Sequence, residues 1–404
     1  MAWSNRIKAI VLGLGFALIY YSGTNWWSIF AHHAPACAPT CTSDFVTFYA
    51  EAKLLREDMS ALYDLNRQFA YQQQISPTTV VLPFVYPPLM AGIIAGLGWL
   101  DFSAAFVAVT LLNIALIGLS VKKLTDHFRL TTDQWHWLSL FACCNIGVHQ
   151  LIYQGQTSAL ILYFTTRCVI AEHRFQHLQA GFWAGFTSLK PQYLPLLHLS
   201  FLVGRKWRAF FVALLVSTIL IGISFFAIGM EASRQYFALT GHMMSNNSDW
   251  WNPPTAMHNL RALTAYWAPT EWRLYVWLAG TVFVIASLVF CNLRVNRHSS
   301  FTGIWLVNIL GLLVTLPHLF THDLSLLILP CALFLDQFKE PVPISIGLGL
   351  IVLAALPIMN YALPTIVAIT LFILYVLSVV LVTYGCNFGR REALDQASMR
   401  SVRL

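Results

Sequence analysis

The sequence contains very little charge. Asp, Glu, Lys and Arg make up 10% of its 404 residues, whereas soluble globular domains average about 25%. Apolar side chains make up 57% of the chain, and the mean hydropathy is +0.64. These values argue against a soluble enzyme, and they exclude a disordered chain, a coiled coil and a disulfide-rich secreted domain.

The usual signatures of nucleotide-driven and hydrolytic chemistry are also lacking. The sequence has no P-loop, no Gly-x-Gly-x-x-Gly after a strand and no Gly-x-Ser-x-Gly. His318 and His322 have the spacing of a metal pair on a helix, but no His-Glu-x-x-His and no carboxylate-rich cluster accompanies them. We therefore expect no metal and no cofactor. No inverted repeat is evident, which weakens a secondary-transporter interpretation.

What the chain does contain is a series of long apolar runs. Each run of about 20 residues can cross the hydrocarbon core as a helix, with its backbone hydrogen-bonded internally. The sequence predicts an all-α fold, a polytopic bundle of about 12 transmembrane helices. We expect one integral-membrane domain over residues 1–386 and a basic tail at 387–404. The segment 84–100 opens with Tyr86-Pro87-Pro88 and contains three glycines, so we expect it to be re-entrant or interfacial.

The distribution of cations predicts the orientation. Lys and Arg number 24 against 17 Asp and Glu, and in a membrane protein this excess indicates topology rather than nucleic acid binding. Basic connectors between the apolar runs belong on the cytoplasmic side. They contain Arg6/Lys8, Lys122/Lys123/Arg129, Arg167/Arg174, Arg205/Lys206/Arg208 and Arg294/Arg297. Both termini are then cytoplasmic, in the cell (cytoplasmic) membrane, and the large loops 31–83 and 230–270 face outward.

Polar motifs gather on the predicted outer side, which indicates one extracytoplasmic site. In the loop 31–83, apolar residues from Phe45 to Met59 recur at helical spacing, and a weaker stretch follows around Leu62 and Phe69. Two amphipathic helices on the membrane surface fit this pattern, with Glu51 on the polar face. Asp44 stands at the start of the first helix. Its residue type fits a helix cap, which composition alone favours, and also a general base.

Lys190 lies at a break between apolar segments. The stretch 176–204 is too long for one span and short for two, so we expect two half-length helices that are interrupted at Lys190-Pro191. An ionisable residue at membrane depth needs a partner, and a phosphate would be suitable. The alternative is a lysine that extends to the interface beside an ordinary proline kink.

The remaining outer-side motifs allow two interpretations each. Trp250 and Trp251 fit stacking on a sugar, but an interfacial aromatic belt explains the pair better. Cys37 and Cys41 fit a disulfide in an oxidising compartment, although free thiols remain the alternative.

A set of short motifs occurs along the chain from the first loop to about residue 330. In chain order, the motifs are Ser43-Asp44-Phe45 with Tyr49 and Ala50, Tyr63-Asp64, Tyr86-Pro87-Pro88-Leu89, Gly155-Gln156, Leu189-Lys190-Pro191, Leu260-Arg261-Ala262-Leu263, and Pro317 with His322. This ordered set resembles glycosyltransferase family 87.

This resemblance implies a GT-C-type membrane transferase that uses a polyprenyl-phosphate sugar, such as polyprenyl-phosphate mannose. Asp44 then matches the catalytic base, and Lys190 and Arg261 match cationic positions for the donor phosphate. Other residues are expected to contact substrate, namely His322, Asp323, Gln156, Tyr86, His258 and Trp251. The chain departs from the family pattern at Asp323, where a second histidine is usual, and at Met257-His258-Asn259, where Asn-Gln-Ser is usual.

We therefore expect a mannosyltransferase that transfers to a hydroxyl of a lipid or glycan on the outer face, with inversion and without a metal. Its partners would be the lipid-linked donor, the acceptor and membrane lipids, with no nucleic acid. The rival interpretation is a transporter or flippase of a lipid-linked sugar, in which the same cations bind phosphate. A transferase needs a base beside the phosphate, whereas a transporter does not.

Overall fold

The computed structural model describes residues 44–76, 81–245, 256–294, 301–338, 341–357 and 365–384. Within these ranges every regular element is a helix, as the sequence predicts. The α-helices are α2 (Asp44–Glu57), α3 (Leu65–Ile75), α4 (Pro88–Ile94), α5 (Phe102–Phe128), α6 (Thr132–Cys144), α7 (Ile146–Tyr153), α8 (Ser158–His173), α9 (His177–Gly185), α10 (Leu194–Val203), α11 (Trp207–Ser245), α12 (Leu260–Trp267), α13 (Arg273–Arg294), α14 (Phe301–Thr315), α15 (Ile328–Leu335), α16 (Ile344–Ala355) and α17 (Ile366–Tyr384).

Short 3-10 helices connect several of these elements. They are η1 (Met59–Ala61), η2 (Ala95–Trp99), η3 (Phe186–Leu189), η4 (Pro191–Tyr193), η6 (Thr270–Trp272) and η7 (Thr321–Leu327). Three of them, η2, η3 and η4, bear on the sequence predictions. Helices η3 and η4 flank Lys190, so the predicted interruption at Lys190-Pro191 is confirmed. Helices α4 and η2 together cover 88–99, about 20 Å at rises of about 1.5 Å and 2.0 Å per residue, which is too short to cross a bilayer.

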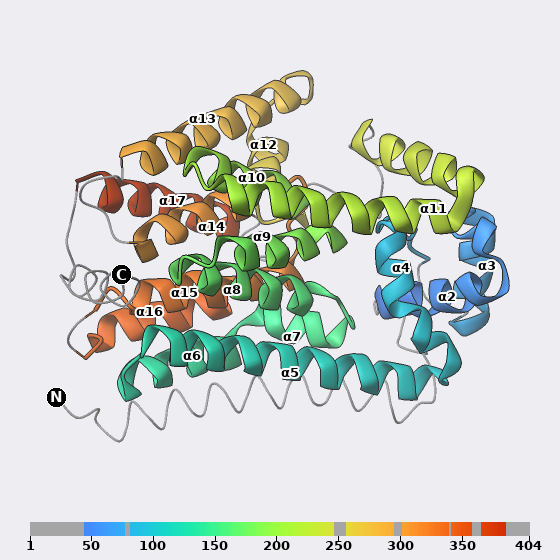
Figure 1. Cartoon of the computed structure of the whole chain (residues 1–404), viewed down its shortest axis with the longest axis horizontal. Coiled ribbons are helices and arrows are strands. Elements are labelled where there is room, and N and C mark those ends of the chain that lie inside the picture. Colours follow the sequence, from blue (N-terminus) through green and yellow to red (C-terminus); the bar gives the residue numbers. More distant parts are fainter. Residues whose placement is uncertain are drawn as a thin grey trace.

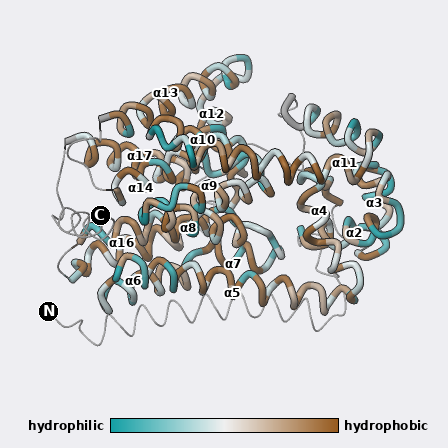
Figure 2. Tube along the Cα trace, viewed as in Figure 1, coloured by the Kyte–Doolittle hydropathy of each residue, from teal (hydrophilic) through white to brown (hydrophobic). Residues whose placement is uncertain are grey.

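Long apolar helices form the outside of a bundle around buried ones. Four helices within the described ranges are long and apolar enough to span a membrane, at Phe102–Phe128, Trp207–His242, Thr270–Leu293 and Ile366–Thr383. They expose large apolar side chains such as Phe226, which is 89% exposed. In Figure 1, α8 and α14 lie inside this layer, and Figure 2 shows hydrophobic residues along most of the helices. An exposed apolar surface of this extent is typical of contact with lipid.

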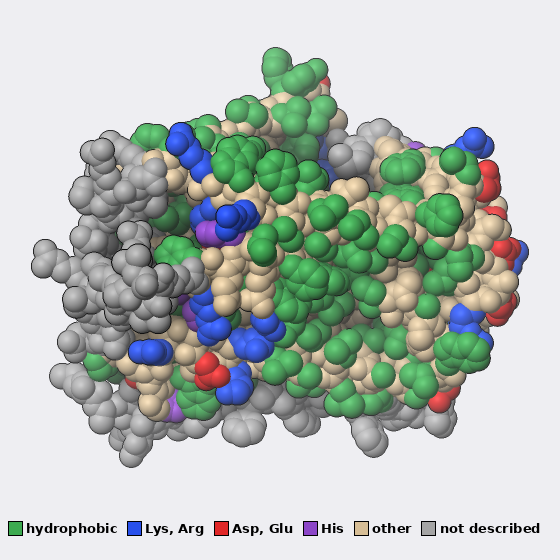
Figure 3. All heavy atoms as spheres, viewed as in Figure 1, with side chains coloured by type: hydrophobic (Ala, Val, Ile, Leu, Met, Phe, Trp, Pro, Cys, Tyr) green, Lys and Arg blue, Asp and Glu red, His purple; other side chains and the backbone are tan. Residues whose placement is uncertain are grey.

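Figure 1 also shows the two ends of the molecule. Helices α2, α3 and α4 gather at the right-hand end, beside the start of α5 and the far part of α11. Helix α11 turns there at Gly229, whose φ of 80° is left-handed and suits glycine. The opposite end carries the basic connectors, where Lys206 of the α10–α11 turn pairs with Glu172 of α8 at 2.5 Å. Lys, Arg and His side chains cluster on that side in Figure 3.

The two helices predicted in the first loop are present, but the prediction of their buried faces is wrong. Helix α2 is buried around most of its circumference, because α3, α4, η2 and α5 all pack against it. Glu51, which we placed on a polar face, is 0% exposed, and neither carboxyl oxygen has a hydrogen-bond partner within the described residues. Burial raises the pKa of Glu51 well above its usual value, which favours the neutral acid.

Helix α3 also departs from the expected pattern. It buries Gln68 and Gln72, while Leu65 is 37% exposed. The Gln68 side chain donates to Leu62 O at 2.7 Å and accepts from Phe84 N at 3.0 Å. Gln72 makes the same pair of contacts with the backbone of Leu82. The glutamines therefore hold the extended segment that leads to Tyr86, which is why polar residues occupy the inner face of α3.

The apolar stretch 134–151 is divided into two helices. Helix α6 ends at Cys144 and α7 begins at Ile146. The Asn145 side chain accepts from Gly147 N at 2.7 Å, capping α7, and donates to Leu324 O at 3.2 Å. This break brings α7 against η7, where Ser325 N would lie 2.5 Å from a Cβ at Gly147. Close approach of these two elements positions His322 and Asp323.

Candidate functional site

Asp44 is the first residue of α2, and its side chain faces the start of α8. Asp44 Oδ2 accepts a hydrogen bond from Gln156 Nε2. The Gln156 side chain accepts in turn from the Tyr86 hydroxyl at 2.9 Å, and its backbone oxygen accepts from Asn113 Nδ2 at 2.9 Å. Gln156 is therefore fixed from both sides and orients the Asp44 carboxyl.

Gly155 allows this contact between α2 and the α7–α8 turn. Its φ of +61° lies in the left-handed region, and a Cβ there would lie 2.8 Å from Phe45 Cβ. A side chain at this position would be strained by its backbone conformation and would also overlap α2. The Gly155-Gln156 motif thus combines a turn with a polar side chain directed at Asp44.

Lys190 forms a buried ion pair with Asp323. Its Nζ lies 2.8 Å from Asp323 Oδ1 and donates to Ser158 Oγ, also at 2.8 Å. Ser158 Oγ donates to Asp323 Oδ1 at 2.6 Å. Lys190 and Asp323 are each 2% exposed. Because Pro191 ends the preceding helical turn, the Lys190 side chain leaves the backbone at the interruption and reaches both α8 and η7.

His322 lies beside the same carboxylate. Its Nε2 is 3.5 Å from Asp323 Oδ2, and its Nδ1 is 3.0 Å from Gln154 Oε1. The carboxylate at position 323, which the sequence marks as a departure from the usual histidine pair, is therefore the partner of Lys190. A histidine in its place would leave the buried ammonium without a counter-charge.

His258 and Arg261 are held against the chain just before η7. His258 N donates to Leu319 O at 2.8 Å, and His258 Nε2 lies 2.9 Å from Thr321 Oγ1. Asn259 caps α12 by accepting from Ala262 N at 3.0 Å. Arg261 donates to Pro317 O at 3.4 Å and is 9% exposed. The start of α12 is thus docked next to His322 and Asp323.

The charged groups also influence one another. Burial raises the pKa of Asp44 to about 6, although the Gln156 hydrogen bond and the positive charge of Lys190 oppose this shift. Burial lowers the pKa of His258 to about 4. Burial, together with the nearby charge of Arg261, lowers the pKa of His318 to about 4. Both imidazoles are therefore neutral at pH 7, whereas Asp44 is mainly a carboxylate with an appreciable affinity for a proton.

Residues 84–317 match the model of glycosyltransferase family 87, which is more than half of the chain. The chain belongs to glycosyltransferase family 87. It is therefore a membrane glycosyltransferase, an enzyme that transfers a sugar from a donor to an acceptor. No curated protein and no solved structure matched the chain.

Some candidate residues of this family 87 enzyme lie outside the matched range. Gln156, Lys190 and Arg261 lie within 84–317, whereas Asp44 and Asp323 do not. The structure connects the two groups, because Asp44 binds Gln156 and Asp323 binds Lys190. Hydrogen bonds thus join Asp44, Gln156 and Tyr86, while Lys190 and His322 both contact Asp323. These two sets meet where Lys190 Nζ lies 5.8 Å from the centroid of the Tyr86 ring. His258 and Arg261 bind the backbone just before η7.

One predicted site residue lies outside the described residues, and sequence reasoning missed one residue that the site contains. Trp251 lies outside the described residues, as do Cys37 and Cys41. Sequence reasoning missed Ser158, which is 0% exposed and bridges Lys190 and Asp323. The only signal for Ser158 was its position directly after the Gln156-Thr157 turn, which is weak because serine is common at helix starts.

Proposed function

We propose that this family 87 enzyme transfers mannose from polyprenyl-phosphate mannose to a hydroxyl group of a lipid or glycan. The choice of mannose and of a polyprenyl donor rests on the motif resemblance. One observation carries the chemical part of the proposal. A carboxyl group with a raised pKa, Asp44, lies in one hydrogen-bonded and electrostatic cluster with the buried Lys190–Asp323 pair. A base beside a phosphate-binding cation is what sugar transfer from a lipid phosphate requires.

In this proposal Asp44 is the general base. The acceptor hydroxyl loses its proton to the Asp44 carboxylate as its oxygen forms a bond to the anomeric carbon of the sugar. The bond from that carbon to the phosphate oxygen breaks, and its electron pair leaves with the lipid phosphate. Single displacement of a β-linked donor gives an α-linked product. A pKa of about 6 suits this role, because Asp44 is ionised at pH 7 and still accepts a proton.

The leaving phosphate is stabilised by Lys190 and Arg261 in this proposal. An ammonium has three N–H donors, and Lys190 uses two of them on Ser158 and Asp323. The third remains for a phosphate oxygen. Because Asp323 already balances the charge of Lys190, the positive charge that offsets the phosphate comes mainly from Arg261. In a site of low dielectric, the Arg261 charge and the third N–H donor of Lys190 are sufficient for this purpose, and the proposal includes no metal.

We further propose that the enzyme crosses the cytoplasmic membrane about 12 times, with both termini inside and the Asp44 site on the outer face. The arrangement of the long helix α5 supports this. Its 27 residues extend over about 40 Å, more than the hydrocarbon thickness. Its first turn lies by α2, where the rings of Tyr49 and Phe102 have centroids 5.3 Å apart. Its last turn lies at the basic end, where His127 Nε2 is 2.9 Å from His173 Nδ1.

The test of this function is an assay of Asp44→Asn with radiolabelled polyprenyl-phosphate mannose and candidate acceptor lipids. The amide keeps the size of the side chain but cannot accept the proton, so transfer is expected to fall by about 10²–10⁴-fold. Gln74→Asn, at an exposed position on α3, is the control and should keep full activity. Near-normal transfer by folded Asp44→Asn would contradict the base assignment. If polyprenyl-phosphate glucose were the better donor, the sugar assignment would be wrong while the base assignment would stand.

A further inference from the structure

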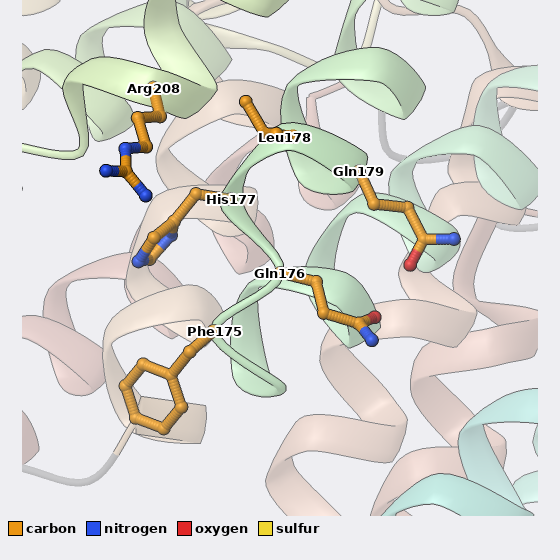
Figure 4. A pocket seen from close by; sticks show the side chains of 6 residues that line it. All are labelled: Phe175, Gln176, His177, Leu178, Gln179 and Arg208. Carbon is orange, nitrogen blue, oxygen red and sulfur yellow. The ribbon is translucent and has the colours of Figure 1, made fainter. Parts of the chain in front are cut away.

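A hollow that contains Arg208 lies at the opposite end of the molecule from Asp44. It has a volume of about 450 Å³ and is lined by the turn between α8 and α9 and by the start of α11. Figure 4 shows its lining residues, and the Arg208 guanidinium and the His177 ring extend to the same side of that turn. This volume lies within the range of small-ligand sites, about 300–1,000 Å³. The residues that line it are Phe175, Gln176, His177, Leu178, Gln179 and Arg208.

The charge of this hollow is positive. Glu172, the carboxylate next to it, already pairs with Lys206 at 2.5 Å and with His177 at 3.0 Å. Arg208 has neither a hydrogen bond nor an ion pair with any residue of the described ranges. The Arg208 charge is therefore not neutralised by a protein carboxylate in the part of the chain that the structure describes. A hollow with such a charge favours an anion.

Backbone groups add to this preference. Helix α9 begins at His177, and no side chain caps its start. The first N–H groups of a helix have no partner within the helix and carry a partial positive charge. The residues that carry these N–H groups, His177 to Gln179, line the same hollow as Arg208. A phosphate group accepts hydrogen bonds from both kinds of donor.

Exposed apolar side chains extend away from the hollow along both helices. On α9, Leu178 and Phe182 are 59% and 43% exposed and lie four residues apart, on one face. On α11, Trp207 and Phe211 are 51% and 59% exposed and stack with ring centroids 6.4 Å apart. The two helices are in close contact, since a Cβ at Gly181 would lie 2.3 Å from Ala209 O. A charged hollow that opens onto a lipid-facing apolar surface matches a phospholipid, with its headgroup at the hollow and its chains along the helices.

We propose that this hollow binds the phosphate of an anionic phospholipid in the leaflet at the basic end of the molecule. The phosphate contacts Arg208 and the amides at the start of α9, and the acyl chains lie against Leu178, Phe182, Trp207 and Phe211. Basic residues in cytoplasmic connectors also set topology, but topology requires no hollow. This site is separate from the sugar-transfer site, because α5 extends about 40 Å between the two ends.

The experiment measures equilibrium binding of radiolabelled dioctanoyl phosphatidylglycerol to the full-length protein in a neutral detergent. Arg208→Gln removes the charge, and Gln179→Glu places a carboxylate at the mouth of the hollow, so each is expected to weaken binding about tenfold or more. Both positions are exposed, and the fold should tolerate the changes. Arg234→Gln, an exposed cation in the far part of α11, is the matched control and should bind as the unmodified protein does.

Competition experiments identify the source of the phosphate. Unlabelled dioctanoyl phosphatidylcholine and inorganic phosphate should each compete at least about tenfold more weakly than unlabelled dioctanoyl phosphatidylglycerol. Equal competition by phosphatidylcholine would contradict the preference for an anionic lipid. Equal competition by inorganic phosphate would contradict the assignment of a lipid as the ligand. Unchanged binding by both Arg208→Gln and Gln179→Glu would show that the phosphate does not bind in this hollow.

Discussion

At the scale of the residue, burial and the neighbours of Asp44 have opposite effects on its pKa. Burial raises its pKa to about 6 from the ordinary value of 3.8, while the Gln156 hydrogen bond and the Lys190 charge stabilise the carboxylate. Below pH 6 the side chain is mainly protonated and cannot accept a proton. If Asp44 is the base, kcat/KM for the donor should fall as the pH decreases through about 6.

Gln156→Leu tests this dependence. Loss of the amide donor removes one of the two groups that stabilise the carboxylate, so the pKa of Asp44 should rise and the acidic limb of kcat/KM should move above pH 6. Activity at pH 7 should then fall while activity at pH 8 is less affected. The measurement is a pH–rate profile from pH 5 to pH 9, with Gln74→Leu on the exposed side of α3 as the control. An acidic limb that stays in place in Gln156→Leu would contradict the coupling of these two side chains.

The raised pKa also affects stability. Between pH 4 and pH 6 the folded state holds a proton on Asp44 that the unfolded chain has released. Stability therefore decreases as the pH rises through this window, because the folded protein must ionise a buried group. Thus the same burial that makes Asp44 a better proton acceptor also makes its charged form costly, which is a common arrangement in active sites.

The identities of the site residues were more predictable from sequence than their pairings. Lys190 stands out because a lysine beside a proline within apolar sequence is unusual. Asp44 fits an ordinary helix cap, and only the motif resemblance marks it as a base. The partner of Lys190 is Asp323, 133 positions away, and local spacing carries no information about such a contact. The sequence therefore supported a phosphate as the partner of Lys190, whereas the structure places a protein carboxylate there.

At the scale of the element, the turn between α7 and α8 determines whether α2 can reach Gln156. Gly155→Ala introduces a Cβ at a φ of +61° and within 2.8 Å of Phe45 Cβ. Backbone strain and overpacking together should destabilise the protein by about 2–4 kcal/mol. Sugar transfer should also fall, because α2 carries Asp44.

The measurement is the melting temperature in detergent, together with transfer activity. Gly118→Ala is the matched control, since Gly118 lies within α5 and a Cβ there has no neighbour within 4 Å. An alanine in a helix interior should leave stability unchanged or raise it slightly. Equal melting temperatures for Gly155→Ala and Gly118→Ala would show that the turn tolerates a side chain, contrary to the geometry.

Element boundaries were predictable where a residue type enforces them. Pro191 cannot continue the helix that precedes it, and the interruption at Lys190-Pro191 follows directly. The burial of α2 could not be predicted in this way. Its apolar spacing resembles that of a surface helix, and only the packing of four other elements around it explains why Glu51 is buried.

At the scale of the whole molecule, two polar regions lie at opposite ends of a lipid-facing bundle. Asp44 and its neighbours lie at the end where α5 begins, and the Arg208 hollow lies at the end where α5 finishes and the basic connectors gather. In the proposed orientation, the cations mark the second end as cytoplasmic. Sugar transfer is therefore expected on the outer face, with lipid binding on the inner face.

Single cysteines at the two ends test this orientation. In a background without native cysteines, Gln73→Cys on α3 reports on the Asp44 end, and Lys122→Cys on α5 reports on the basic end. Both positions are exposed, and α5 separates the two ends by about 40 Å. A membrane-impermeant maleimide should label Gln73→Cys in intact cells and Lys122→Cys only in inverted vesicles. The reverse pattern would place the transfer site in the cytoplasm, and labelling of both from one side would mean that α5 does not cross the bilayer.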